Sequence, residues 1–87
     1  MARKLVYPAV FYPCDDGKGF AVEVPDLPGC VSEGDSLADA IEMGEDAASG
    51  WIWGELEDGN DIPKPSDLKD IVPDESDGFV RYLSLDI

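Results

Sequence analysis

Apolar and polar residues alternate in the manner of β-strands in three segments near the start of the chain. Segment 4–13 is rich in β-branched and aromatic side chains, and every second residue of segment 20–24 is apolar. Segment 30–34 continues as a short third strand. An Asp-Gly pair separates the first two segments, and a Pro-Asp-Leu-Pro-Gly run separates the second from the third. Both are turn signals, so the pattern predicts three antiparallel strands joined by two hairpins.

Pro8 interrupts the first of these segments. A proline has no N–H to donate to a β-ladder, so it is found on edge strands or at bulges. The sequence leaves both possibilities open. An incompletely paired edge would also be able to accept another chain.

The spacing of apolar residues changes to that of a helix after residue 36. Small and apolar residues recur every three or four positions and predict its inward face: Leu37, Ala40, Ile41, Gly44, Ala48, Trp51 and Ile52. Asp35 or Ser36 is expected to cap the first turn, and segment 58–60 is expected to end the helix. Three glycines within it suggest that another backbone packs closely against the helix: Gly44, Gly50 and Gly54.

A polar connector and a final strand complete the chain. Segment 58–78 holds three prolines and many acids, with one helical turn expected at 66–70. It would cross back to the sheet, or become ordered on a partner. Segment 79–87 alternates apolar and polar residues and predicts a strand beside the first one. The sequence therefore predicts an α+β fold of order β-β-β-α-β, with the helix packed on one face of the sheet, in a single domain covering residues 1–87.

The net charge of the chain is the most unusual feature of its composition. Twenty Asp and Glu residues stand against six Lys and Arg, without histidine, for a formal net charge of -14. Such a field repels phosphate backbones and attracts basic proteins. The same acidity would also keep a small protein soluble without any partner. The sequence has neither an apolar run of roughly 20 residues nor a signal-peptide pattern, so we expect a cytoplasmic protein.

The two cysteines are predicted to be free thiols. Their spacing fits no metal motif. In the predicted hairpins Cys14 and Cys30 lie at opposite ends of the sheet, on the order of 15–20 Å apart, whereas a disulfide needs Cα atoms within about 7 Å.

Enzymatic chemistry finds little support in the sequence. The paired acids are adjacent in the chain, and neighbouring residues do not face each other in a helix or a strand. The serines and cysteines have no histidine to activate them, and no phosphate-binding glycine loop is present. The element order resembles the first part of the ribonuclease H fold, in which metal-binding carboxylates include one on the first strand. Segment 4–13 contains no acid, so Glu42 or Glu45 with Asp86 would make an incomplete metal site. We expect no catalytic residue, metal or cofactor.

Trp51 and Trp53 are two positions apart on the predicted helix, about 200° around its axis, so they cannot share one face. With Trp51 packed inward, Trp53 points outward along the stripe that carries Met43 and Gly50. An exposed tryptophan is typical of a protein interface. Alternatively, Trp53 folds over the connector.

The segments 20–30, 34–40 and 61–66 together resemble the HicB antitoxin family. The matching features are an aromatic strand, a Pro-Asp-Leu-Pro-Gly-Cys turn, a Gly-Asp-Ser helix start, an alanine-rich acidic helix and a Pro-x-Pro-Ser segment. The motif residues in the turn and the helix start are Pro25, Asp26, Leu27, Pro28, Gly29, Gly34, Asp35 and Ser36. Their physical role is structural, because they fix the second hairpin and begin the helix.

The resemblance implies a degraded ribonuclease H-like fold and a partner of the HicA type, a small basic protein that cleaves mRNA with a histidine. Proteins of the family bind this toxin, block its active site and commonly form dimers or higher oligomers. Many carry a C-terminal DNA-binding domain, which has no counterpart before Ile87. We therefore expect no direct nucleic-acid binding by this chain.

The sequence is thus interpreted as a non-catalytic antitoxin that occludes the active site of a basic toxin RNase. The expected interface is Glu45, Asp46, Trp53, Glu57 and the acidic connector. The alternative is an orphan module of the same family that binds another basic protein or only itself.

Overall fold

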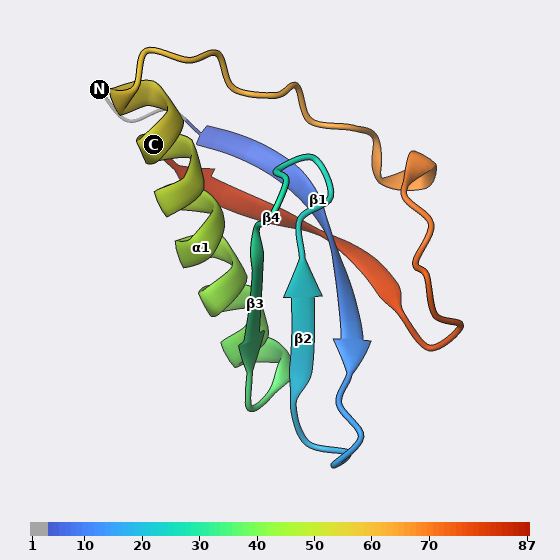
Figure 1. Cartoon of the computed structure of the whole chain (residues 1–87). Helices are drawn as coiled ribbons and strands as arrows, with labels where there is room; N and C mark the ends of the chain where they lie inside the picture. The colour runs from blue at the N-terminus through green and yellow to red at the C-terminus, as the bar shows by residue number, and fades with distance from the viewer. Residues whose placement is uncertain (1–3) are drawn as a thin grey trace.

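The computed structural model describes residues 4–87 and contains every element that the sequence predicts (Figure 1). The strands and helices are β1 (Lys4–Pro13), β2 (Phe20–Glu23), β3 (Val31–Gly34), α1 (Leu37–Glu57), the 3₁₀ turn η1 (Leu68–Asp70) and β4 (Phe79–Asp86). The four strands form one antiparallel sheet in the order β3-β2-β1-β4. The predicted α+β fold is confirmed, and so is the position of the last strand beside the first.

Pro8 lies in an interior strand, so its predicted place on an edge strand was wrong. The pairing of β1 with β4 also continues in register through Pro8 and Tyr82, which excludes the predicted bulge at that residue. The N–H of Cys14 donates to the Gly19 carbonyl at 2.8 Å, so even-numbered residues of β1 bond toward β2. Pairing with β2 begins only at Val10. The nitrogen of Pro8 therefore points to the β2 side of β1, but at a position beyond the end of the β1–β2 pairing, so no ladder bond is lost.

The helix packs on the concave side of the curved sheet, as Figure 1 shows. Its buried residues are Ala40, Gly44, Ala48 and Ile52, all from the predicted inward face. A Cβ at Gly44 would lie 3.2 Å from side-chain atoms of Leu83 and Val22. The small residue thus brings the helix close to the sheet, but against side chains rather than a second backbone. Around Gly50 and Gly54 no such contact exists, so of the three helix glycines only Gly44 marks close packing.

Tyrosine hydroxyls hold the connector between α1 and β4 against the rest of the chain. Tyr7 donates to the carbonyl of Pro63 at 2.6 Å. Tyr82 accepts from the N–H of Leu68, and Tyr12 accepts from that of Asp74, both at 3.0 Å. In Figure 1 the connector leaves the end of α1 and returns along the side of the sheet away from the helix. Of the two predictions, the crossover is confirmed, because these bonds order the connector without a partner.

Cys14 and Cys30 are both free thiols, as expected from the hairpin geometry. Within residues 4–87 no helix combines the length and the apolarity needed to cross a membrane.

Candidate functional site

The Pro-Asp-Leu-Pro-Gly turn between β2 and β3 is a rigid structural unit. The N–H of Leu27 donates to the Val24 carbonyl at 3.0 Å, and that of Cys30 donates to the Leu27 carbonyl at 2.9 Å. Gly29 has a φ of 81°, a left-handed conformation that glycine adopts without strain. The side chain of Leu27 is buried in the core. The turn is therefore built for packing and not for chemistry.

Asp26 ties this turn to the connector. Its two carboxylate oxygens accept from the backbone N–H and the hydroxyl of Ser66, each at 2.7 Å. The turn motif and the Pro-x-Pro-Ser segment lie 40 residues apart in sequence, and this pair of bonds joins them. Trp51 adds a third tie, since its indole N–H donates to the Pro28 carbonyl at 3.0 Å. The prediction that Trp51 packs inward is confirmed, with its indole over the turn.

Replacing Asp26 with alanine is expected to lower the free energy of unfolding by about 1–2 kcal/mol, because two hydrogen bonds to a charged acceptor are lost at a partly exposed position. Amide hydrogen exchange should accelerate in segment 62–70 more than in α1. Chemical denaturation and exchange mass spectrometry measure the two effects. Equal acceleration throughout the chain would contradict the local role of Asp26.

The start of α1 is fixed by Ser36 and Gly34. The hydroxyl of Ser36 accepts from the Asp39 N–H at 3.1 Å, so Ser36 and not Asp35 is the capping residue. Gly34 lies directly against the first turn, where a Cβ would come within 2.7 Å of the Ala40 Cα. The close crossing turns the chain sharply from β3 into the helix.

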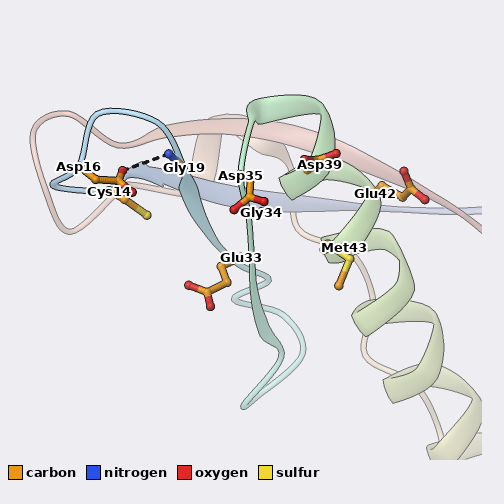
Figure 2. Close-up of a pocket in the computed structure, with 9 residues that line it drawn as sticks. All are labelled: Cys14, Asp16, Gly19, Glu33, Gly34, Asp35, Asp39, Glu42 and Met43. Atoms are coloured by element: carbon orange, nitrogen blue, oxygen red, sulfur yellow. Dashed lines mark hydrogen bonds between the residues drawn. The ribbon is translucent and has the colours of Figure 1, made fainter.

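An acidic groove of about 610 Å³ opens beside this crossing (Figure 2). The groove is lined by Cys14, Asp16, Gly19, Glu33, Gly34, Asp35, Asp39, Glu42 and Met43. Its five carboxylates come from the β1–β2 turn, from β3 and its end, and from α1. Within residues 4–87 no three cysteine or acidic side chains are arranged to hold a metal ion. The groove has the charge to receive cationic side chains.

Two groups at the edge of the groove have shifted pKa values. The Asp16 carboxylate accepts from the backbone N–H groups of Lys18 and Gly19, at 2.9 and 3.2 Å, and these bonds lower its pKa. Desolvation raises the pKa of the Cys14 thiol, and the neighbouring carboxylates of Asp16 and Glu33 raise it further. Burial raises the pKa of Cys30. The lowered pKa keeps Asp16 charged to lower pH than an ordinary aspartate, and the raised pKa values make the thiolate forms of Cys14 and Cys30 rarer than in a free cysteine.

Both cysteines are expected to react slowly with iodoacetamide at neutral pH. A raised pKa means that the thiolate is rarer than in a free cysteine, so the alkylation rate should keep rising above pH 9. Cys30, which is buried, should react more slowly than Cys14, which is only half-buried. Mass spectrometry of timed samples, with a denatured control, measures the two rates. Fast alkylation of Cys14 at pH 7 would contradict the electrostatic effect.

The outward side of α1 continues the acidic surface along the helix. Trp53 and Met43 are 48% and 45% exposed, and Asp46 and Glu57 are also exposed. We define the acidic helix face as Asp39, Glu42, Met43, Asp46, Trp53 and Glu57, which follow one another at helical spacing. It extends over about 27 Å of helix. The predicted exposure of Trp53 is confirmed.

Glu45 lies apart from this face. Its carboxylate accepts from the N–H of Ser84 at 3.2 Å, on the outer edge of β4. The four residues expected to form one interface are thus divided between three on the acidic helix face and one against the sheet. Glu45 protects a strand edge and stabilises the position of α1 on β4.

The carboxylates of the surface are not neutralised by the chain itself. Among residues 4–87 no lysine or arginine nitrogen comes within 4.0 Å of a carboxylate oxygen. The last turn of α1 contains no basic residue, although cations are favoured at that end of a helix. The negative potential therefore remains available to a ligand of opposite charge.

Sequence reasoning missed the acidic groove. In the sequence Asp39 and Glu42 have the spacing of the polar face of an amphipathic helix, and Asp16 stands in a turn. The groove depends on the crossing at Gly34, which brings the β1–β2 turn close to the helix start. The spacing of Asp35, Asp39 and Glu42 indicates one acidic helix side, but nothing in it indicates a hollow.

A sequence model described as the HicB_like antitoxin of bacterial toxin-antitoxin systems matches residues 7–87. An uncharacterised 14.9 kDa protein of Haemophilus phage HP1 is 34% identical over 85 residues, covering 95% of this chain and 62% of the phage protein. Antitoxin HicB 1 of Photorhabdus laumondii is 33% identical over 63 residues, covering 72% of this chain and 40% of that protein. The chain thus spans less than two thirds of the length of either relative.

Two solved structures share the fold. A chain of a HicA3 and HicB3 toxin-antitoxin complex superposes with a TM-score of 0.77 at 25% identity, covering 95% of this chain and 100% of that chain. The N-terminal domain of the Burkholderia pseudomallei antitoxin HicB gives a TM-score of 0.79 at 24% identity, with the same coverage of both chains.

Proposed function

The chain belongs to the HicB-like antitoxin family of bacterial toxin–antitoxin systems, and we propose that it neutralises a small basic toxin of the HicA type by covering the toxin's active site. The proposal treats residues 1–87 as one binding domain without catalytic activity of its own. It is supported by the structural likeness to a chain of the HicA3 and HicB3 toxin-antitoxin complex.

The observation that carries the proposal is the uncompensated acidic surface formed by the acidic groove and the acidic helix face. Its carboxylates have no cationic partner among residues 4–87. Trp53 and Met43 supply apolar contact area within the same surface. A basic protein would gain both electrostatic steering and a hydrophobic anchor there. Blocking then needs no chemistry from this chain, because a bound protein excludes the RNA substrate by its volume and charge.

Co-expression with a small basic protein of the HicA type, taken from a gene adjacent to that of this chain where one is present, tests the proposal. Growth should be rescued, and the two proteins should co-purify as a complex that dissociates more readily at high salt, because exposed charge pairs are screened. Purified toxin should cleave RNA alone and lose that activity when the chain is added. A chain that leaves toxicity and RNA cleavage unchanged would refute the antitoxin function and favour a module for another basic protein or for itself.

A further inference from the structure

The two outer edges of the sheet differ in how they are protected. The N–H of Cys14 bonds toward β2, so the backbone groups of odd-numbered residues of β1 bond toward β4. The backbone N–H and C=O groups of even-numbered residues of β4 therefore point outward from the sheet. On this edge the Ser84 N–H is occupied by the Glu45 carboxylate. Such an acceptor on a strand edge blocks the addition of another strand.

The edge of β3 has no such protection. The N–H of Val24 donates to the Cys30 carbonyl at 3.0 Å, which places Ser32 and Gly34 in the bonding positions toward β2. The backbone groups of Val31 and Glu33 therefore point outward. Among residues 4–87 no hydrogen bond to these outward groups is found. Val31 is 62% exposed, and Glu33 is exposed as well.

Two hollows flank this bare edge, one lined by five carboxylates and the other lined more by apolar residues. The acidic groove lies at the crossing from β3 to α1, where Asp35 and Asp39 lie between Glu33 on β3 and Glu42 on α1 (Figure 2). A second groove of about 420 Å³ lies on the convex face of the sheet and is lined by Tyr12, Ala21, Val22, Glu23, Val31, Ser32 and Glu33. Glu33 borders both hollows.

We propose that the β3 edge receives an extended strand of the toxin, in which lysine or arginine alternates with apolar residues. Successive side chains of a strand point to opposite faces, so such a strand would direct its basic residues into the acidic groove and its apolar residues into the convex groove. Main-chain bonds to Val31 and Glu33 would hold it in register. The inference rests on the proposed function for the identity of the partner.

Charge selects this occupant over a second copy of the chain. A copy would bring a net charge of -14 to an edge already bordered by Glu23, Glu33 and Asp35. The repulsion between two such surfaces opposes pairing, whereas a basic strand is attracted.

Two substitutions test the edge with the purified toxin. Val31→Pro removes an outward N–H without removing a bond to β2, and Glu33→Lys reverses the charge shared by both hollows. Each is expected to weaken toxin binding about tenfold or more, as measured by calorimetry. Asp86→Lys is the matched control, because it makes the same charge change at an exposed residue of β4, the opposite edge strand, and should leave affinity within about twofold. Amide spectra of the variants establish that each is folded.

A synthetic octapeptide of alternating lysine and valine tests the edge without the toxin. Hydrogen exchange in the full chain should slow about tenfold or more at the Val31 and Glu33 amides and stay unchanged at Ser32 and Gly34. A peptide of alternating glutamate and valine should have no effect.

The outcomes separate the two proposals. Toxin that binds wild type and all three variants equally overturns the strand inference and retains the antitoxin function. If the toxin does not bind wild type, the antitoxin function fails, and the peptide decides the inference: protection of the two amides supports a basic-strand site, and its absence overturns it. Concentration-dependent protection of the same amides in the chain alone would assign the edge to a second copy and overturn the proposed occupant.

Discussion

Replacing Gly34 with alanine is expected to lower the free energy of unfolding by about 2–3 kcal/mol, because the added methyl group would collide with backbone and not with a movable side chain. The methyl carbon would lie 2.7 Å from the Ala40 Cα and closer still to other atoms of the first helical turn. That turn is held by the Ser36 cap and by the buried Ala40. The collision can be relieved only by moving the start of α1 away from β3.

Gly54→Ala is the matched control. Gly54 lies within α1 with open space around its Cα, so the same methyl group should stabilise the chain by about 0.5–1 kcal/mol through helix propensity. Urea denaturation of both variants measures the difference. Because Gly34 also lines the acidic groove, its substitution should disturb the amide signals of Asp16 and Glu42, which Gly54→Ala should leave in place. A Gly34→Ala variant as stable as wild type would contradict this prediction, because it would show that the crossing of β3 and α1 has room for a methyl group.

The elements of this fold were predictable because each depends on local chemistry. The alternation in segment 79–87 places Leu83 and Leu85 inside and Tyr82 and Ser84 outside, as burial confirms. The order of the strands also followed, since two short turns allow only antiparallel neighbours. Pro8 could not be placed correctly. Whether an interior strand tolerates a proline at this position depends on where β2 stops pairing with β1, which no local pattern encodes.

The candidate site was only partly predictable for the same reason. The exposure of Trp53 follows from helical geometry, because its partner Trp51 must face the turn at Pro28. Glu45 looked equivalent to Asp46 in sequence, yet the two point to different sides of α1. Whether an acidic side chain of α1 faces solvent or a strand edge depends on where β4 is placed. The β4 residue that bonds Glu45 is Ser84, which is 39 residues away in sequence. Long-range placement also creates the acidic groove.

Replacing Trp53 with alanine is expected to weaken binding of the toxin by about 2 kcal/mol, or roughly 30-fold, while leaving the stability of the free chain nearly unchanged. The indole is 48% exposed and makes no hydrogen bond in the free chain, so its removal costs little on folding. In a complex the same ring would be covered together with Met43, within a ring of carboxylates that includes Asp46 and Glu57. Loss of the indole ring should therefore weaken the complex and leave the stability of the free chain nearly unchanged.

Val72→Ala separates this effect from a general loss of surface apolarity. Val72 is 81% exposed in the connector and lies outside both the acidic groove and the acidic helix face. Calorimetric titration of the toxin should give the wild-type affinity for Val72→Ala, and thermal unfolding should give similar midpoints for both variants. The salt dependence of binding should persist in Trp53→Ala, because the carboxylates remain and only the apolar anchor is removed. If Trp53→Ala binds as tightly as wild type while Glu33→Lys does not, the toxin contacts the β3 edge alone and the acidic helix face serves only to attract it.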